Sequence, residues 1–207
     1  MESDVAEAPA PVAKGRPREF CTDAALAAAL RVFWSKGYEA ASLTELTEAM
    51  GITRPSLYAA FGNKEALFHK ALDLYEREKL AYTRRALDQP TARAVADHVL
   101  RGALAVQMGS DEPHGCLGVI STMPCGAEAQ PIRDAVIARR LSSQQALVDR
   151  FVRAQAEGDL SADIDAAGLT RYLYALVQGM AVQASSGATR AEMEQLVDLC
   201  MRLWPSR

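Results

Sequence analysis

Apolar residues recur at helical spacing along nearly the whole chain. In residues 23–36 they form one broad stripe, and Gly37 follows where that helix is expected to end. The same periodicity predicts further helices at residues 43–50, 53–61, 64–87, 91–108, 131–157, 165–184 and 189–204. No segment keeps the alternation of apolar and polar residues that a half-buried strand shows. The pattern therefore predicts an all-α protein.

Three segments interrupt this pattern. The N-terminus carries acids and prolines but few large apolar side chains, so we expect a disordered tail at residues 1–15. Residues 109–126 are rich in Gly, Pro and Ser and are expected to form a loop, with a short helix near 117–123. The sequence Glu-Gly-Asp-Leu at 157–160 is typical of a turn that ends a helix.

The composition is that of an ordinary globular protein, with 49% hydrophobic and 24% charged residues. No apolar run approaches the roughly 20 residues that a membrane-spanning helix needs. The acidic N-terminus lacks the features of a secretory signal, so we expect a cytoplasmic protein without a membrane partner. The four cysteines are scattered without a Cys-x-x-Cys pair, and no metal or cofactor is expected.

A capping box and a glycine mark the segment after residue 41. Ser42 and Glu45 have the spacing at which each side chain caps the other's backbone, so a short helix is expected to begin there. Gly51 follows that helix and allows a sharp turn, because glycine tolerates a positive φ. Thr189 and Glu192 repeat the capping-box spacing before the last helix.

A second short helix follows the glycine turn. Thr53 is placed to cap it, and Pro55 lies in its first turn, where a missing N–H costs little. Leu57 and Phe61 are spaced to point inward, which leaves small and polar residues on the outer face. Two short helices joined by a glycine turn indicate a helix-turn-helix that reads the DNA major groove. The spacing alone fits a plain corner between two helices equally well.

The outer residues have chemistry suited to DNA. Arg54 can donate to guanine edges or to phosphate, and Thr53 and Ser56 can bond to either. Tyr58 can contact a phosphate through its hydroxyl, although a half-buried core role is also open. Lys64 opens the next helix, whose N-terminal N–H groups favour a phosphate.

The net charge of −3 does not exclude DNA binding, because the charge is unevenly distributed. Residues 14–64 carry seven basic and five acidic side chains, and affinity for a duplex depends on local neutralisation of phosphates. Lys14, Arg16 and Arg18 lie in a run with Gly and Pro. This run is either a solvated linker or an arm that follows the narrow minor groove.

Residues 18–75 resemble the N-terminal domain of the TetR/AcrR family of transcriptional regulators. The resemblance is carried by the segments VFWSKGY at 32–38, SLTEL at 42–46, MGI at 50–52 and PSLYAAFGNKEALF at 55–68. The family implies a three-helix DNA-binding domain, here residues 16–63, whose third helix lies in the major groove. We add to this helix the basic arm and the residues at the starts of the neighbouring helices. The residues expected to contact DNA are then Arg16, Arg18, Ser42, Thr44, Thr53, Arg54, Ser56, Leu57, Tyr58, Asn63 and Lys64.

The family further implies that residues 64–207 form a helical ligand-binding and dimerisation domain. The implied protein is a homodimeric repressor of operator DNA that a small-molecule inducer, of unknown identity, releases. The last two helices carry wide apolar stripes, which either complete their own domain core or pack with a second copy into a four-helix bundle. The expected dimer contacts are Leu169, Tyr172, Leu173, Leu176, Met180, Met193, Leu196, Leu199, Cys200 and Leu203.

A ligand pocket is expected among the helices of residues 64–157. A ligand that prefers a wide-spaced dimer would move the two recognition helices off successive major grooves. A plain core role is the commoner one for each candidate. The candidate lining residues are Phe68, Leu72, Tyr75, Leu104, Met108, Cys116, Met123 and Phe151.

Other functions have less support in the sequence. Cys116 and Cys125, with His114, would suit a thiol-based redox or electrophile sensor or a soft-metal site, although buried inert cysteines are commoner. A helical module that binds proteins and has lost DNA binding is a further alternative. An enzyme is not expected, because no Ser/His/Asp grouping, phosphate-binding glycine loop or His-Glu-x-x-His motif is present.

Overall fold

The computed structural model describes residues 21–122 and 126–205 of the chain. Every regular element within these residues is a helix, which confirms the predicted all-α fold. The tail expected at residues 1–15 lies outside the described residues. The elements are α1 (Thr22–Ala40), α2 (Leu43–Met50), α3 (Arg54–Phe61), α4 (Lys64–Glu78), α5 (Ala81–Leu87), α6 (Ala92–Gln107), α7 (Leu117–Ile120), the 3-10 helix η1 (Ala127–Ala129), α8 (Gln130–Ala156), α9 (Ala166–Ser185) and α10 (Arg190–Arg202).

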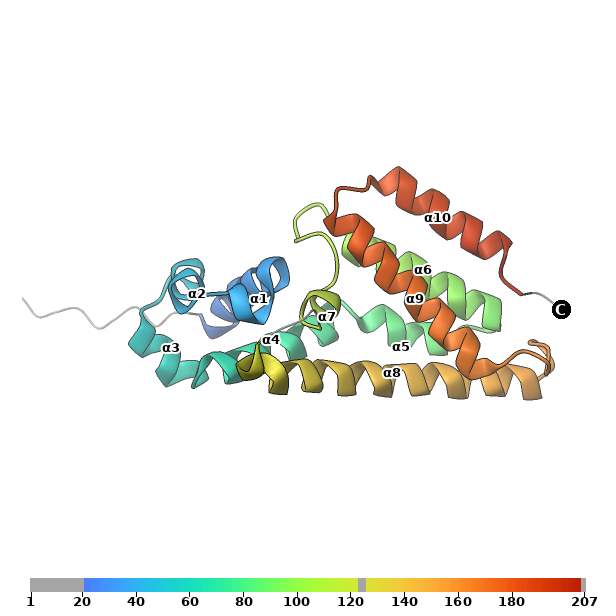
Figure 1. Ribbon diagram of the computed structural model, residues 1–207, viewed down its shortest axis with the longest axis horizontal. Coiled ribbons are helices and arrows are strands. Elements are labelled where there is room, and N and C mark those ends of the chain that lie inside the picture. Colours follow the sequence, from blue (N-terminus) through green and yellow to red (C-terminus); the bar gives the residue numbers. More distant parts are fainter. Residues whose placement is uncertain (1–20, 123–125, 206–207) are drawn as a thin grey trace, which may run out of the picture.

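The helices are arranged along an elongated molecule (Figure 1). α1, α2 and α3 form one end, and α5, α6, α9 and α10 form the other. The 27-residue helix α8 runs along the lower side of this view, and Arg139 ties it to α4 through ion pairs with Asp73 (2.6 Å) and Glu76 (2.9 Å). Within the described ranges, no helix combines the length and the apolarity needed to cross a membrane.

Two hydrophobic cores lie along this length. The N-terminal core is built mainly from α1–α4, with Phe33 against Phe68, and it also includes Leu117 of α7 and Ile132 and Val136 from the start of α8. The C-terminal core is built from α5, α6, α8, α9 and α10. Because α4 belongs to the N-terminal core, that core continues past residue 64, where the second domain was predicted to begin.

The single helix predicted at residues 64–87 is two helices, so this prediction was wrong. α4 ends at Glu78 and α5 begins at Ala81, and Leu80 between them leaves the helical conformation at φ −98° and ψ 9°. Leu80 packs against both hydrophobic cores. The break therefore falls where the chain passes from one core to the other. α8, by contrast, is one unbroken helix.

Contacts between α1 and the loop before α7 connect the two cores. Trp34 Nε1 donates a hydrogen bond of 3.3 Å to the carbonyl of Gly115. Glu112 of the same loop pairs with Arg31 of α1 (3.6 Å) and with Lys79 at the end of α4 (2.7 Å). A displacement of this loop would therefore act directly on α1.

Candidate nucleic-acid interface

α2 begins with a complete capping box, as predicted. Ser42 Oγ accepts a hydrogen bond from the Glu45 N–H (3.2 Å), and the Ser42 N–H donates to Glu45 Oε2 (3.0 Å). Lys36 of α1 donates to the other carboxylate oxygen of Glu45. The hydrogen bond from Lys36, followed by those from Ser42, lowers the pKa of Glu45 to about 2. The ionised Glu45 carboxylate thus caps α2 and ties it to α1.

The turn between α2 and α3 has the predicted left-handed glycine. Gly51 lies at φ 65° and ψ 30°, and its N–H donates to the Glu48 carbonyl at 3.1 Å. No atom lies within 4 Å of the position that a Cβ would take at Gly51. The requirement for glycine therefore comes from the backbone conformation and not from crowding. Ile52 follows the turn and packs against the N-terminal core.

α3 has one buried face and one exposed face. Leu57 is fully buried and Phe61 nearly so, whereas Tyr58 is 50% exposed. Thr53 caps the helix by accepting the Ser56 N–H at 3.3 Å. The outward residues Ala59 and Ala60 are small, which suits entry into a groove about 12 Å wide.

Leu57 was predicted to contact DNA, and this prediction was wrong. Its side chain is fully buried in the N-terminal core, so it anchors α3 and cannot reach a partner. The exposed candidates on and beside α3 are Thr53, Arg54, Tyr58 and Asn63, with Ser56 partly buried.

Arg54 is held in place by the preceding helix. Its Nη2 donates a hydrogen bond of 2.7 Å to Oγ1 of Thr44, near the start of α2. Both side chains are exposed, and both were predicted to contact DNA. The hydrogen bond brings these two predicted contacts together on one surface at the N-terminal ends of α2 and α3.

The start of α4 lies beside this surface. Asn63 caps the helix through Oδ1, which accepts the Ala66 N–H at 2.7 Å. The Lys64 ammonium lies 4.6 Å from the centroid of the Tyr38 ring and donates to the Glu39 carbonyl at 3.4 Å. Partial burial lowers the pKa of Lys64. Its contact with a phosphate stays a prediction.

The expected minor-groove arm, with Arg16 and Arg18, lies outside the described residues. Residues 21–64 hold four basic and four acidic side chains. The basic excess counted over residues 14–64 therefore comes from residues 14–20, which carry three basic side chains and one acidic side chain.

The predicted pocket residues do not form one set. Phe68 and Leu72 belong to the N-terminal core, whereas Leu104, Met108 and Phe151 belong to the C-terminal core. One pocket lined by all of them stays a prediction, because these residues are divided between two cores that Leu80 and Val106 join.

Phe68 is fully buried in edge-to-face contact with Phe33 and Tyr38, so it forms part of the packing of the N-terminal core. Two predicted pocket residues do meet: the Tyr75 hydroxyl donates to Cys116 Sγ at 3.5 Å. Met123 lies outside the described residues.

Cys125, the second cysteine of the thiol-sensing alternative, also lies outside the described residues. In the part of the chain that the structure describes, no three His, Cys, Asp or Glu side chains gather as a metal site would require. Cys116 is half-buried, directly before α7, with Tyr75 as its hydrogen-bond donor. This alternative is not favoured.

The predicted dimer contacts divide into three groups by exposure. One group is buried within the C-terminal core of a single chain, so a place in the dimer interface stays a prediction for its members; it comprises Leu169, Leu173, Met180, Met193 and Cys200. Leu176 and Leu196 are partly buried against the same core, whereas Tyr172, Leu199 and Leu203 are 44%, 46% and 69% exposed. Val182 of α9 is 52% exposed and was not among the predicted contacts.

Comparison with protein families gives two matches along the chain. Residues 25–71 match the family described as bacterial regulatory proteins, tetR family. Residues 93–199 match the tetracyclin repressor-like C-terminal domain. The first match spans most of α1, α2, α3 and the beginning of α4, and the second runs from the start of α6 into α10.

Two relatives come from Escherichia coli (strain K12). The chain is 34% identical to the HTH-type transcriptional repressor ComR over 196 residues, which cover 93% of this chain and 92% of ComR. It is 28% identical to the HTH-type transcriptional repressor BdcR over 176 residues, which cover 84% of this chain and 83% of BdcR.

Solved structures give the same picture. A cysteine mutant of the TetR family transcriptional regulator CifR, complexed with 26-base-pair operator DNA, is 41% identical with a TM-score of 0.86. That match covers 92% of this chain and 100% of the CifR chain. A TetR transcriptional regulator from Rhodococcus sp. RHA1 is 40% identical with a TM-score of 0.63, covering 88% of this chain and 98% of the other.

Proposed function

The chain belongs to the tetR family of bacterial regulatory proteins, and we propose that it is a repressor that binds operator DNA as a homodimer and is released by a small molecule. The relatives ComR and BdcR are named as repressors, and CifR was solved on operator DNA. These relationships motivate the proposal, and the geometry of α2 and α3 gives it a physical basis.

The exposed face of α3 is the observation that carries the proposal. Leu57 and Phe61 anchor α3 in the N-terminal core, and Thr53 caps the start of the helix. Arg54 and Tyr58 stand at the surface beside small alanines. A rigid helix with a slim outer face and a cation at its N-terminus has the form required to enter a major groove.

A homodimer supplies the second recognition helix. Exposed apolar side chains on α9 and α10, namely Tyr172, Val182, Leu199 and Leu203, support an interface formed by these two helices with a second copy. Two copies of α3 would then meet half-sites about 34–36 Å apart, one turn of the duplex.

The proposal is tested by binding to DNA from upstream of the chain's own gene. Fluorescence anisotropy of a labelled duplex should show affinity at least roughly a thousandfold above that for a scrambled duplex. The logarithm of the binding constant should fall linearly with the logarithm of the salt concentration. Equal affinity for the two duplexes would contradict the proposal.

A pair of matched variants locates the DNA-binding surface. Arg54→Gln removes a cation from α3, and Arg77→Gln removes one from the exposed end of α4. We expect Arg54→Gln to weaken specific binding by about 1–3 kcal/mol and Arg77→Gln to leave it unchanged. Equal effects of the two variants would count against α3 as the reading helix.

A further inference from the structure

Part of the loop that follows α6 runs alongside α1. Glu112 of this loop pairs with Arg31 of α1 at 3.6 Å. Three residues later, the carbonyl of Gly115 accepts the Trp34 indole N–H at 3.3 Å, and Trp34 lies three residues after Arg31. The loop and α1 therefore run in the same direction. Residues 112–120 are called the connecting segment below.

The connecting segment follows α1 as far as a break in the helix. Gly37 interrupts α1 with a non-helical backbone at φ 78° and ψ 174°. A Cβ added at Gly37 would lie 3.6 Å from Cγ1 of Ile120, so Ile120 packs beside this interruption. Leu117, earlier in the segment, is fully buried in the N-terminal core. The connecting segment therefore contacts α1 from Arg31 to Gly37.

The connecting segment also lies against α9. Gly115 has a φ of 97°, and a Cβ added there would lie only 3.1 Å from the carbonyl oxygen of Ala181. The Gly115 N–H donates to the carbonyl of Gln107 at 3.0 Å, and Gln107 Nε2 donates to the carbonyl of Val177 at 3.0 Å. Gly115 therefore joins α1 to α9, which carries part of the proposed dimer interface.

Glu112 attaches the connecting segment to two helices of the N-terminal core. One carboxylate oxygen pairs with Arg31 of α1, and the other accepts a hydrogen bond of 2.7 Å from Lys79 at the end of α4. The Glu112 side chain is only 21% exposed. Two cations on one half-buried carboxylate hold it more firmly than a single exposed ion pair would.

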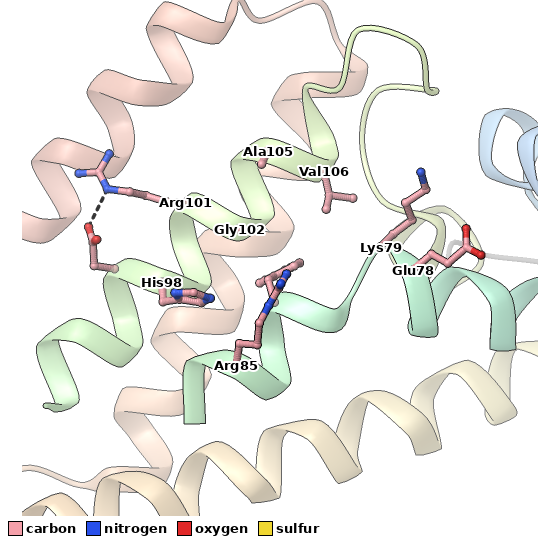
Figure 2. Close-up of a pocket in the computed structure, with 10 residues that line it drawn as sticks. Glu78, Lys79, Arg85, His98, Arg101, Gly102, Ala105 and Val106 are labelled. Carbon is pink, nitrogen blue, oxygen red and sulfur yellow. Dashed lines mark hydrogen bonds and ion pairs between the residues drawn. The ribbon is translucent and has the colours of Figure 1, made fainter. Parts of the chain in front are cut away.

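Packing alone does not fix the end of α4. A groove of about 370 Å³ lies between this end, α5 and α6, and Figure 2 shows Lys79 and Val106 among the residues that line it. Because side chains do not fill this groove, the position of Lys79 depends more strongly on its ion pair with Glu112.

The position of α1 is passed on to the helix-turn-helix. Lys36 of α1 donates a hydrogen bond to the Glu45 carboxylate of α2. Arg54 of α3 donates a hydrogen bond of 2.7 Å to the Thr44 hydroxyl of α2. These contacts connect α1, α2 and α3 in turn. The connecting segment therefore links the recognition helix α3 to α9 by way of α1.

We propose that the connecting segment sets the distance between the two recognition helices of the dimer, and so decides which half-site spacing the protein accepts. Glu112 is the positioning residue, because it holds the segment to α1 and to α4 at once. Two copies of α9 meet in the proposed dimer, so each α3 is placed relative to its counterpart. The inference rests on the proposed function, because a half-site spacing exists only for a dimer on operator DNA.

The test compares two operators that differ only in half-site spacing. A base pair inserted at the centre of the selected operator moves the half-sites apart by about 3.4 Å and rotates one against the other by about 35°. A dimer whose recognition helices are fixed cannot follow this change without strain. We expect fluorescence anisotropy to show that the wild type binds the original operator at least roughly tenfold more tightly than the lengthened one.

Glu112→Gln removes both ion pairs and nearly keeps the shape of the side chain. We expect it to bind the original operator less tightly and to reduce the discrimination between the two operators by about threefold or more. Loss of an acid would by itself favour DNA binding, so this fall in affinity is opposite to the plain effect of charge. Asp97→Asn, which removes one acid and its 2.9 Å ion pair with Arg101 within α6, should keep the wild-type discrimination.

Arg31→Gln breaks one of the two pairs from the side of α1, and it decides the question if Glu112→Gln fails to fold. Loss of a cation lowers the affinity for both operators, and only a loss of positioning changes their ratio. A ratio unchanged from the wild type in Glu112→Gln or in Arg31→Gln overturns the inference, as does a wild type that binds both operators equally. Failure of the wild type to bind either operator above a scrambled duplex would instead refute the proposed function.

Discussion

The guanidinium of Arg54 donates a hydrogen bond of 2.7 Å to the Thr44 hydroxyl, and this contact joins the two helices of the helix-turn-helix. Arg54 therefore has a fixed direction before DNA arrives. We therefore expect Thr44 to affect DNA binding by positioning Arg54. A side chain positioned in advance loses less conformational entropy on binding than a freely rotating one.

Removing the acceptor should weaken DNA binding. Thr44→Val keeps the shape of the side chain but leaves Arg54 unpositioned, and we expect an affinity loss of about 0.5–1.5 kcal/mol. Thr47→Val is the matched control, because Thr47 is buried and its hydroxyl bonds to carbonyls of its own helix. Fluorescence anisotropy with the specific duplex measures the DNA affinity of both variants. A positioning role for Thr44 is excluded if the two variants bind equally well.

The glycine of the connecting loop should be irreplaceable for a steric reason. Gly115 and Gly187 have nearly the same φ, 97° and 96°. A Cβ at Gly115 would lie 3.1 Å from the Ala181 carbonyl oxygen, whereas at Gly187 it would meet nothing within 4 Å. Both alanine variants carry a backbone cost of about 1–2 kcal/mol.

We expect Gly115→Ala to lower the free energy of unfolding by a further ~1–3 kcal/mol, because α9 must move to admit the methyl group. Urea denaturation measures the difference between the two variants. Identical losses would mean that the loop does not press against α9 as described.

The dimer interface should be sensitive to charge on α10. Leu199→Glu places a carboxylate on a side chain that is 46% exposed in the single chain, and burying it against a second copy would be unfavourable. We expect light scattering to show the mass of one chain instead of two, together with weaker operator binding. Val152→Glu, at an exposed apolar residue of α8, is the control and should stay dimeric. A dimeric Leu199→Glu would place the interface elsewhere.

Protonation of Glu45 at low pH should remove the cap at the start of α2 and lower the stability of the chain. The folded-state pKa of Glu45 is lowered to about 2, mainly by the hydrogen bond from Lys36, against an ordinary value of 4.5. Its stabilising contribution is therefore fully present above about pH 4.5 and is lost as the pH falls towards 2. Denaturation midpoints of the wild type and Glu45→Gln should differ at pH 7 and converge in that range. Glu48→Gln, with the same change of charge, should not reproduce this convergence.

Local signals explain what could be predicted from the sequence. Ser42, Gly51 and Thr53 each act on backbone groups within four residues, so their spacing alone predicted α2, the turn and the start of α3. The break at Leu80 depends on its contacts with two distant cores, and no periodicity within residues 64–87 marks it.

The candidate sites follow the same division. Helical spacing predicted that Leu57 points inward, and its side chain is fully buried. The DNA contact that was also predicted for Leu57 does not agree with this burial. The division of the predicted pocket residues between two cores is set by packing between distant segments, which helical spacing within one segment does not show.

Selection of duplexes from a random-sequence pool by the purified chain tests DNA reading without knowledge of the operator. We expect one sequence with two-fold symmetry to be enriched, with half-site centres 10–10.5 base pairs apart or a multiple of that spacing. Two chains should bind each duplex, at least roughly a thousandfold more tightly than an unselected one. A pool that stays random after repeated rounds, with equal affinity for selected and unselected duplexes, would contradict the assignment of α3 as a DNA-reading helix.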